Sequence, residues 1–174
     1  MAYLSPIELG SGTPSHLTPN FSQGGTMANL KRIQFSADIA APVATVYARM
    51  IDPAHYRVWT SAFCEGSTFE GSWATGSRIL FHAGTGDGMV SEIAENRPDA
   101  FISIRHLGFL QGGVEDTQSD AVRAWAGALE NYTFTATPAG THLLIDLDVT
   151  DQFEDDMRAA WPKALERLKA ICEE

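Results

Sequence analysis

The chain has 174 residues, of which 44% are hydrophobic and 20% charged, as is typical of one globular domain with a substantial core. Its formal net charge of −10 argues against binding to nucleic acid or to anionic membranes, because both need a basic surface. No apolar run approaches the roughly 20 residues of a membrane-spanning helix, so we expect no membrane span. The two cysteines, Cys64 and Cys172, lie far apart and fit a reduced, cytoplasmic compartment.

The start of the chain differs in composition from the rest. Residues 1–26 are rich in Ser, Thr, Gly and Pro and carry almost no charge. Such a segment has little apolar surface to bury. We therefore expect residues 1–28 to be a disordered leader or an added tail, and residues 29–174 to form a single domain.

The domain is expected to begin with a strand and two short helices. Apolar and polar residues alternate over residues 31–39, which predicts a half-buried strand. Pro42 suits the first turn of a helix that follows, and Asp52-Pro53 ends this helix because a residue before proline avoids helical conformations. A second short helix is predicted over residues 54–61.

Short segments with strand character then follow one another. Their predicted ranges are 63–69, 78–83, 89–94, 100–109, 125–137 and 142–150. Turn residues separate them, among them Asp87-Gly88 and the segment Pro138-Ala139-Gly140. A polar loop over residues 112–120 lies between the fourth and fifth of these strands.

The chain ends in an amphipathic helix, predicted over residues 151–174. Its apolar residues fall on one stripe about 120° wide and are Phe153, Met157, Trp161, Leu165, Leu168 and Ile171. The order of one strand, two helices, six strands and a long helix predicts an α+β domain. In such a domain the terminal helix covers a curved antiparallel sheet, and Trp161 either fills the space beneath the helix or lines a cavity there.

Four segments of the sequence resemble the SRPBCC superfamily, also called START-like or Bet v 1-like. They read FSADIAAPVATVYARMID, FEGSWATGSRILF, WAGALENYTFTATPAGTHLLIDLDV and WPKALERLKAIC, and they span about residue 31 to the C-terminus. The subgroup that they resemble most is named for homologues of the activator of heat-shock-protein ATPase. The resemblance implies a helix-grip fold, in which a curved seven-stranded sheet wraps around the C-terminal helix and leaves a cavity. It also implies binding of apolar molecules such as lipids or polyketides, with cyclase or hydrolase activity in a few members.

Two polar residues are expected to face the interior of this sheet. If Tyr132 faces inward, the strand period of two places Glu130 inward as well, and Ile104 does the same for His106. The loop between the two strands centres near residue 118, so we expect His106 opposite Glu130. A buried carboxylate beside an imidazole is costly unless the two groups hydrogen-bond. We hypothesise that His106, Glu130 and Tyr132 orient the polar end of a ligand; the alternative is a bulge or shifted register that sends Glu130 to solvent.

The leading functional hypothesis is a binding module for a hydrophobic small molecule, which could be a lipid, an aromatic compound or a polyketide-like compound. The expected lining residues are Trp59, Phe63, Phe81, His106, Glu130, Tyr132, Phe134, Met157, Trp161 and Leu165. A chaperone-associated or other protein-interaction domain is the alternative, and it predicts a protein partner, an exposed patch on the outer sheet and little internal volume. An enzyme that uses His106 and Glu130 is less favoured, because no nucleophile motif accompanies them. No zinc-ligand spacing occurs either, so we expect no metal, cofactor or catalytic residue.

Overall fold

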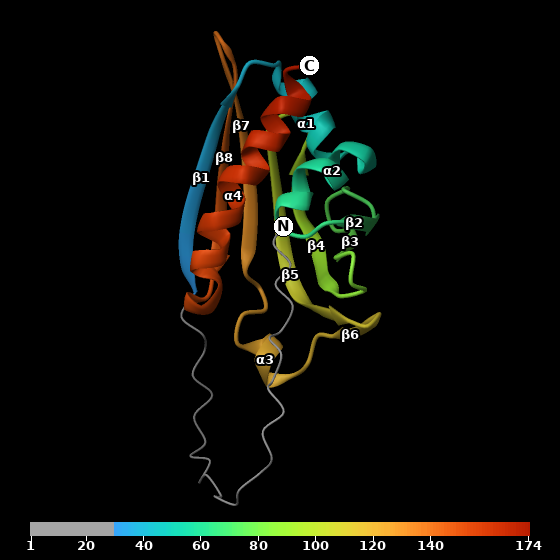
Figure 1. The fold of residues 1–174 in the computed structure, drawn as a ribbon. Coiled ribbons are helices and arrows are strands. Elements are labelled where there is room, and N and C mark those ends of the chain that lie inside the picture. Colours follow the sequence, from blue (N-terminus) through green and yellow to red (C-terminus); the bar gives the residue numbers. More distant parts are fainter. Residues whose placement is uncertain (1–29) are drawn as a thin grey trace, which may run out of the picture.

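A curved antiparallel sheet and a long C-terminal helix make up most of the structure (Figure 1). The computed structural model describes residues 30–174, and the leader predicted over residues 1–28 lies outside this range. Seven strands follow one another across the sheet in the order β1-β8-β7-β5-β4-β3-β2, and β6 pairs with β5 off this path. The predicted α+β class and helix-grip arrangement are confirmed.

The bounds of the elements are as follows. The strands are β1 (Lys31–Ile39), β2 (Thr68–Gly71), β3 (Arg78–His82), β4 (Gly88–Arg97), β5 (Phe101–Gln111), β6 (Val114–Asp116), β7 (Leu129–Thr137) and β8 (Gly140–Val149). The helices are α1 (Val43–Ile51), α2 (Pro53–Trp59), the 3₁₀ turn η1 (Thr60–Ala62), α3 (Asp120–Arg123) and α4 (Asp151–Cys172).

Asp52 separates the two helices that follow β1. Its backbone is extended, which ends α1, and its carboxylate accepts hydrogen bonds from the backbone N–H groups of Ala54 (3.0 Å) and His55 (3.1 Å). Pro53 occupies the first position of α2, where its missing N–H costs nothing. The Asp-Pro pair therefore ends one helix and begins the next.

The structure differs from the sequence-based expectation in three connections. The strand expected from residue 63 begins only at Thr68, because the chain continues from α2 into η1 and a following turn. The polar loop over residues 112–120 contains β6 and is followed by α3. The strand expected from residue 125 begins at Leu129, because Trp125–Ala128 forms turns in which Ala128 N–H donates to the Trp125 carbonyl (3.1 Å).

Helix α4 packs its apolar stripe onto the concave face of the sheet. Figure 1 shows α1 and α2 beside the C-terminal half of α4, whereas its N-terminal end lies toward α3 and the end of β8. Seven residues of α4 are buried: Met157, Trp161, Ala164, Leu165, Leu168, Ile171 and Cys172. Pro162 lies within the helix but is exposed to solvent.

Trp161 fills the space between α4 and the sheet. Its side chain is only 1% exposed. Four aromatic rings surround it, with centroid separations of 5.0 Å to Phe63, 5.8 Å to Phe35, 6.1 Å to Tyr132 and 6.3 Å to Trp59. This part of the interior is therefore packed core.

Candidate functional site

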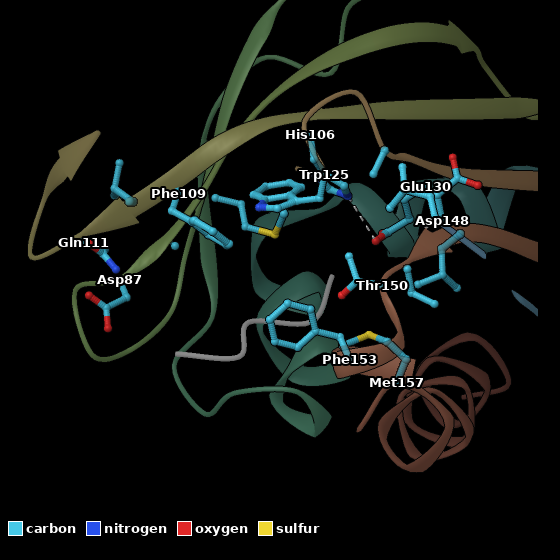
Figure 2. A pocket seen from close by; sticks show the side chains of 17 residues that line it. Asp87, His106, Phe109, Gln111, Trp125, Glu130, Asp148, Thr150, Phe153 and Met157 are labelled. Atoms are coloured by element: carbon cyan, nitrogen blue, oxygen red, sulfur yellow. Dashed lines mark ion pairs between the residues drawn. The ribbon is translucent and has the colours of Figure 1, made fainter. Parts of the chain in front are cut away.

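A cavity of about 90 Å³ opens at the end of the molecule where α4 begins. Figure 2 shows Phe153 and Met157 of α4 on one side of it, and Phe109 and Trp125 on the opposite side. His106 and Glu130 lie at one end of the lining, whereas Asp87 and Gln111 lie at the other end. Apolar walls with a few converging polar groups are typical of small-molecule sites.

Regular and irregular segments together position the apolar walls. Phe153 and Met157 are four residues apart on α4, so they share one helix face. Trp125 comes from the turn after α3, where its backbone N–H donates to the Val122 carbonyl (3.0 Å). Its indole packs on Phe109 of β5 with ring centroids 4.6 Å apart. The loop side chain is thereby fixed against the sheet.

His106 and Glu130 form a buried polar pair at the cavity wall. Their exposed fractions are 7% and 3%, and His106 Nε2 lies 3.7 Å from Glu130 Oε2. A hydrogen bond of 3.0 Å joins His106 Nδ1 to the hydroxyl of Ser91, and the Tyr132 hydroxyl donates a hydrogen bond to Glu130. Glu130 thus faces the interior, and the alternative in which it reaches solvent does not occur.

The register between β5 and β7 differs from the expected one. Ile104, rather than His106, is the partner of Glu130, and the His106 N–H donates to the Ala128 carbonyl (3.0 Å). The expectation of a directly opposite pair was therefore wrong by two residues. Because two residues along a strand restore the same face, both side chains still point inward and meet diagonally across the strands.

The surroundings of Glu130 shift the pKa values of its own carboxyl and of the Tyr132 hydroxyl. Burial raises the pKa of the Glu130 carboxyl, but its interactions with His106 and Tyr132 lower it, and the net effect is a pKa of about 2. Burial and the charge of Glu130 raise the pKa of Tyr132 well above its ordinary value. At neutral pH a carboxylate therefore accepts the hydrogen bond of a protonated phenol.

Two further polar atoms of the cavity wall have no hydrogen-bond partner among the residues described. They are Nε1 of Trp125 and Oγ1 of Thr150, and both atoms are buried. Thr150 occupies the N-cap position of α4, but its side chain makes no capping hydrogen bond. Buried polar groups are nearly always paired in folded proteins, and these two atoms differ from the other unpaired ones among residues 30–174 in belonging to residues that line the cavity, where water or a ligand can reach them.

Only three of the ten residues expected at the site line this cavity: His106, Glu130 and Met157. Six others belong to the aromatic and aliphatic core or pack against it: Trp59, Phe63, Phe81, Tyr132, Phe134 and Trp161. Leu165 is buried against the core and also borders a separate surface groove beside Phe35 and Pro162. The cavity therefore lies beside the space beneath Trp161, nearer the start of α4.

Sequence reasoning missed several residues that line the cavity, chiefly Phe109, Trp125, Thr150 and Phe153. Phe153 was recognised as part of the apolar stripe but not as a lining residue. Trp125 was assigned to a strand, although Gly127, which has a positive φ of 95°, signals a turn at this point. Among residues 30–174, no group of three His, Cys, Asp or Glu side chains could hold a metal ion.

No family model matches the chain, and no curated protein matches it. Solved structures do match. Protein MLL2253 from Mesorhizobium loti has a TM-score of 0.64 at 18% identity, over 81% of this chain and 96% of that one. The Aha1 dimer from Colwellia psychrerythraea has a TM-score of 0.63 at 18% identity, over 82% and 96%.

A third similar structure is DynU16, a protein of the dynemicin biosynthetic locus. Its TM-score is 0.60 at 20% identity, and the match covers 80% of this chain but 46% of DynU16. This chain therefore corresponds to less than half of DynU16. At such identities these likenesses establish the fold and leave function to the site itself. Within the described part of the chain, no helix is long and apolar enough to cross a membrane.

Proposed function

We propose that this protein binds a hydrophobic small molecule in the cavity at the start of α4, and that it is a cytoplasmic member of the SRPBCC superfamily. The observation that carries the proposal is the composition of the cavity wall. Aromatic rings and a thioether from three separate elements, Phe109, Trp125, Phe153 and Met157, converge beside the buried His106–Glu130 pair. The four sequence segments that resemble the superfamily, together with the helix-grip fold, support the family assignment.

The size of the cavity indicates how a ligand would be held. Pockets for drug-sized ligands commonly measure about 300–1,000 Å³, whereas this cavity measures about 90 Å³. We therefore expect either a small ligand or one end of a larger ligand inside the cavity. Burial of a side-chain-sized apolar group contributes about 1.5–3 kcal/mol, so affinity for a small probe should be modest.

A protein-interaction role is the second candidate, supported by the likeness to the Aha1 dimer structure. It predicts an exposed apolar or charged patch on the outer face of the sheet. The large hydrophobic side chains that are exposed in the described range are Leu30, Val58 and Val114. Leu30 precedes β1, Val58 lies on α2 and Val114 lies on β6, so these three side chains form no continuous apolar patch. The apolar form of the expected patch is therefore absent among residues 30–174, whereas the small volume of the cavity, about 90 Å³, agrees with this second candidate.

Equilibrium titration with acetophenone and with naphthalene, followed by tryptophan fluorescence and by the melting temperature, tests the proposal. We expect saturable binding that Phe153→Asp weakens at least tenfold, since a carboxylate would then face the apolar wall. Val58→Asp is the matched control, because it places the same charge on exposed α2, and it should leave the affinity unchanged. Failure of both compounds to bind the parent protein, or equal losses of affinity in both variants, would overturn the proposal.

A further inference from the structure

The wall of the cavity carries hydrogen-bond donors that have no acceptor among residues 30–174. The indole N–H of Trp125 can only donate, and its nitrogen is buried without an acceptor among the described residues. The ring cannot easily turn away to find one, because it is held against Phe109 at 4.6 Å and lies 6.4 Å from the His106 ring. An acceptor on the ligand would complete this interaction.

The start of α4 adds a second reason to expect an acceptor. Thr150 stands at the N-terminus of a 22-residue helix, and its buried hydroxyl likewise has no partner in the described part of the chain. The N–H groups of such an end carry partial positive charge, which favours the negative end of a dipole. The Trp125 indole and the N-terminus of α4 therefore both favour a ligand with an electron-rich atom, such as a hydrogen-bond acceptor, at this wall.

Full negative charge is disfavoured at the same place. The carboxylate of Glu130 lines the cavity and is ionised at neutral pH, and Asp87 stands at the other end of the lining. In the first turn of α4, Asp151 and Glu154 each lie 2.7 Å from the ammonium of Lys31, and Glu154 also lies 2.8 Å from Arg158 Nη2. Neither Lys nor Arg is among the described residues that line the cavity, so a ligand carboxylate would lie beside the Glu130 carboxylate and be repelled by it.

We propose that the ligand is an uncharged apolar molecule that carries a hydrogen-bond acceptor, such as a ketone, ester or amide carbonyl, and that the indole N–H of Trp125 donates to that acceptor. The proposal rests on the proposed function and names the ligand class for the same cavity. Trp125 is then the residue that determines specificity between carbonyl compounds and plain hydrocarbons of equal shape. Anionic lipids such as fatty acids are rejected.

Three compounds of similar size test this assignment on the full chain: acetophenone, isopropylbenzene and benzoate. The first two share a shape and differ in the acceptor, while benzoate adds a charge. We expect the parent protein to bind acetophenone more tightly than isopropylbenzene, and to bind benzoate at least tenfold more weakly than acetophenone.

The variant Trp125→Phe keeps an aromatic ring and removes the N–H. This substitution should weaken the affinity for acetophenone about fivefold, as expected for the loss of one hydrogen bond. The affinity for isopropylbenzene should change less than twofold. Trp73→Phe is the matched control, since Trp73 also has a buried, unpaired Nε1 but belongs to the aromatic cluster with Tyr56 and Phe81, away from the cavity. It should change neither affinity.

The possible results distinguish a failure of the Trp125 donor role from a failure of ligand binding itself. If acetophenone and isopropylbenzene both bind but Trp125→Phe lowers the two affinities equally, the donor role of Trp125 is refuted. The proposed binding site is not affected by that result. Tight binding of benzoate would refute the requirement for an uncharged ligand. If none of the three compounds binds the parent protein, the proposed function fails, and this inference fails with it.

Discussion

Replacement of Trp161 by alanine should be among the most destabilising single changes in this protein. The side chain is 1% exposed and is surrounded by four aromatic rings, so its removal leaves a large void in the core. Substitutions of buried Phe or Trp by Ala cost about 3–5 kcal/mol of the free energy of unfolding. The indole N–H of Trp161 has no partner among the described residues, so no hydrogen bond is lost and the cost should lie near the lower end.

Urea denaturation followed by circular dichroism measures this change, with the slope of the transition showing whether unfolding remains two-state. Trp125→Ala is the matched comparison, because the same side chain is removed from a half-buried position at the cavity wall. We expect it to cost about 1–2 kcal/mol and to abolish acetophenone binding. A loss below about 1 kcal/mol for Trp161→Ala, or equal losses for both variants, would refute the conclusion that Trp161 fills core while Trp125 lines the cavity.

Three further changes test other parts of the structure. Glu130→Gln should lower stability at neutral pH, and the gap to the parent should close as pH falls from about 5 to about 2, because the parent loses stability when a carboxyl with a lowered folded-state pKa becomes protonated. Burial raises the pKa of the Cys172 thiol to about 11, so iodoacetamide at neutral pH should alkylate the more exposed Cys64 and reach Cys172 only on unfolding. Asp52→Ala should cost about 1 kcal/mol through loss of the α2 N-cap.

Each of these expectations has a control. The carboxyl control for Glu130 is the exposed Glu70 on β2, and its variant Glu70→Gln should follow the pH profile of the parent. Mass spectrometry of the alkylated peptides assigns the cysteine, and rapid alkylation of Cys172 in the folded protein would contradict its burial. Asp52→Asn keeps a capping oxygen and should retain most of the stability that Asp52→Ala loses.

The regular part of the fold could be predicted because local pattern and tertiary structure agree there. The alternation over residues 31–39 matches β1, and the apolar stripe from residue 151 matches α4 to within two residues at its end. In both elements one face is buried against a continuous core. Apolar residues therefore recur in the sequence with the period of a strand in β1 and of a helix in α4. The order of these elements predicted the α+β class, whereas the helix-grip arrangement was expected from the resemblance of four sequence segments to the SRPBCC superfamily.

The cavity was harder to predict because several of its residues lie in the turns and short segments that connect the strands and helices. Phe63 has the apolar character of a strand residue, yet it packs on Trp161 from the turn after η1. Trp125 lies in a turn whose conformation brings its ring to Phe109, a contact that no periodicity describes. The pairing of Ile104 with Glu130 likewise follows from the lengths of β6, α3 and the turn before β7. Such lengths are fixed by short elements with weak sequence signals.

The methionine methyl groups offer the most direct test of the central claim, that an apolar ligand binds in the cavity at the start of α4. Met89 and Met157 line the cavity, whereas Met50 is buried in α1 outside it. In a protein labelled with ¹³C at the methionine methyls, titration with acetophenone should shift the NMR signals of Met89 and Met157 and leave that of Met50 in place. Unchanged signals of Met89 and Met157 at saturating acetophenone, or a dominant shift of Met50, would contradict the claim.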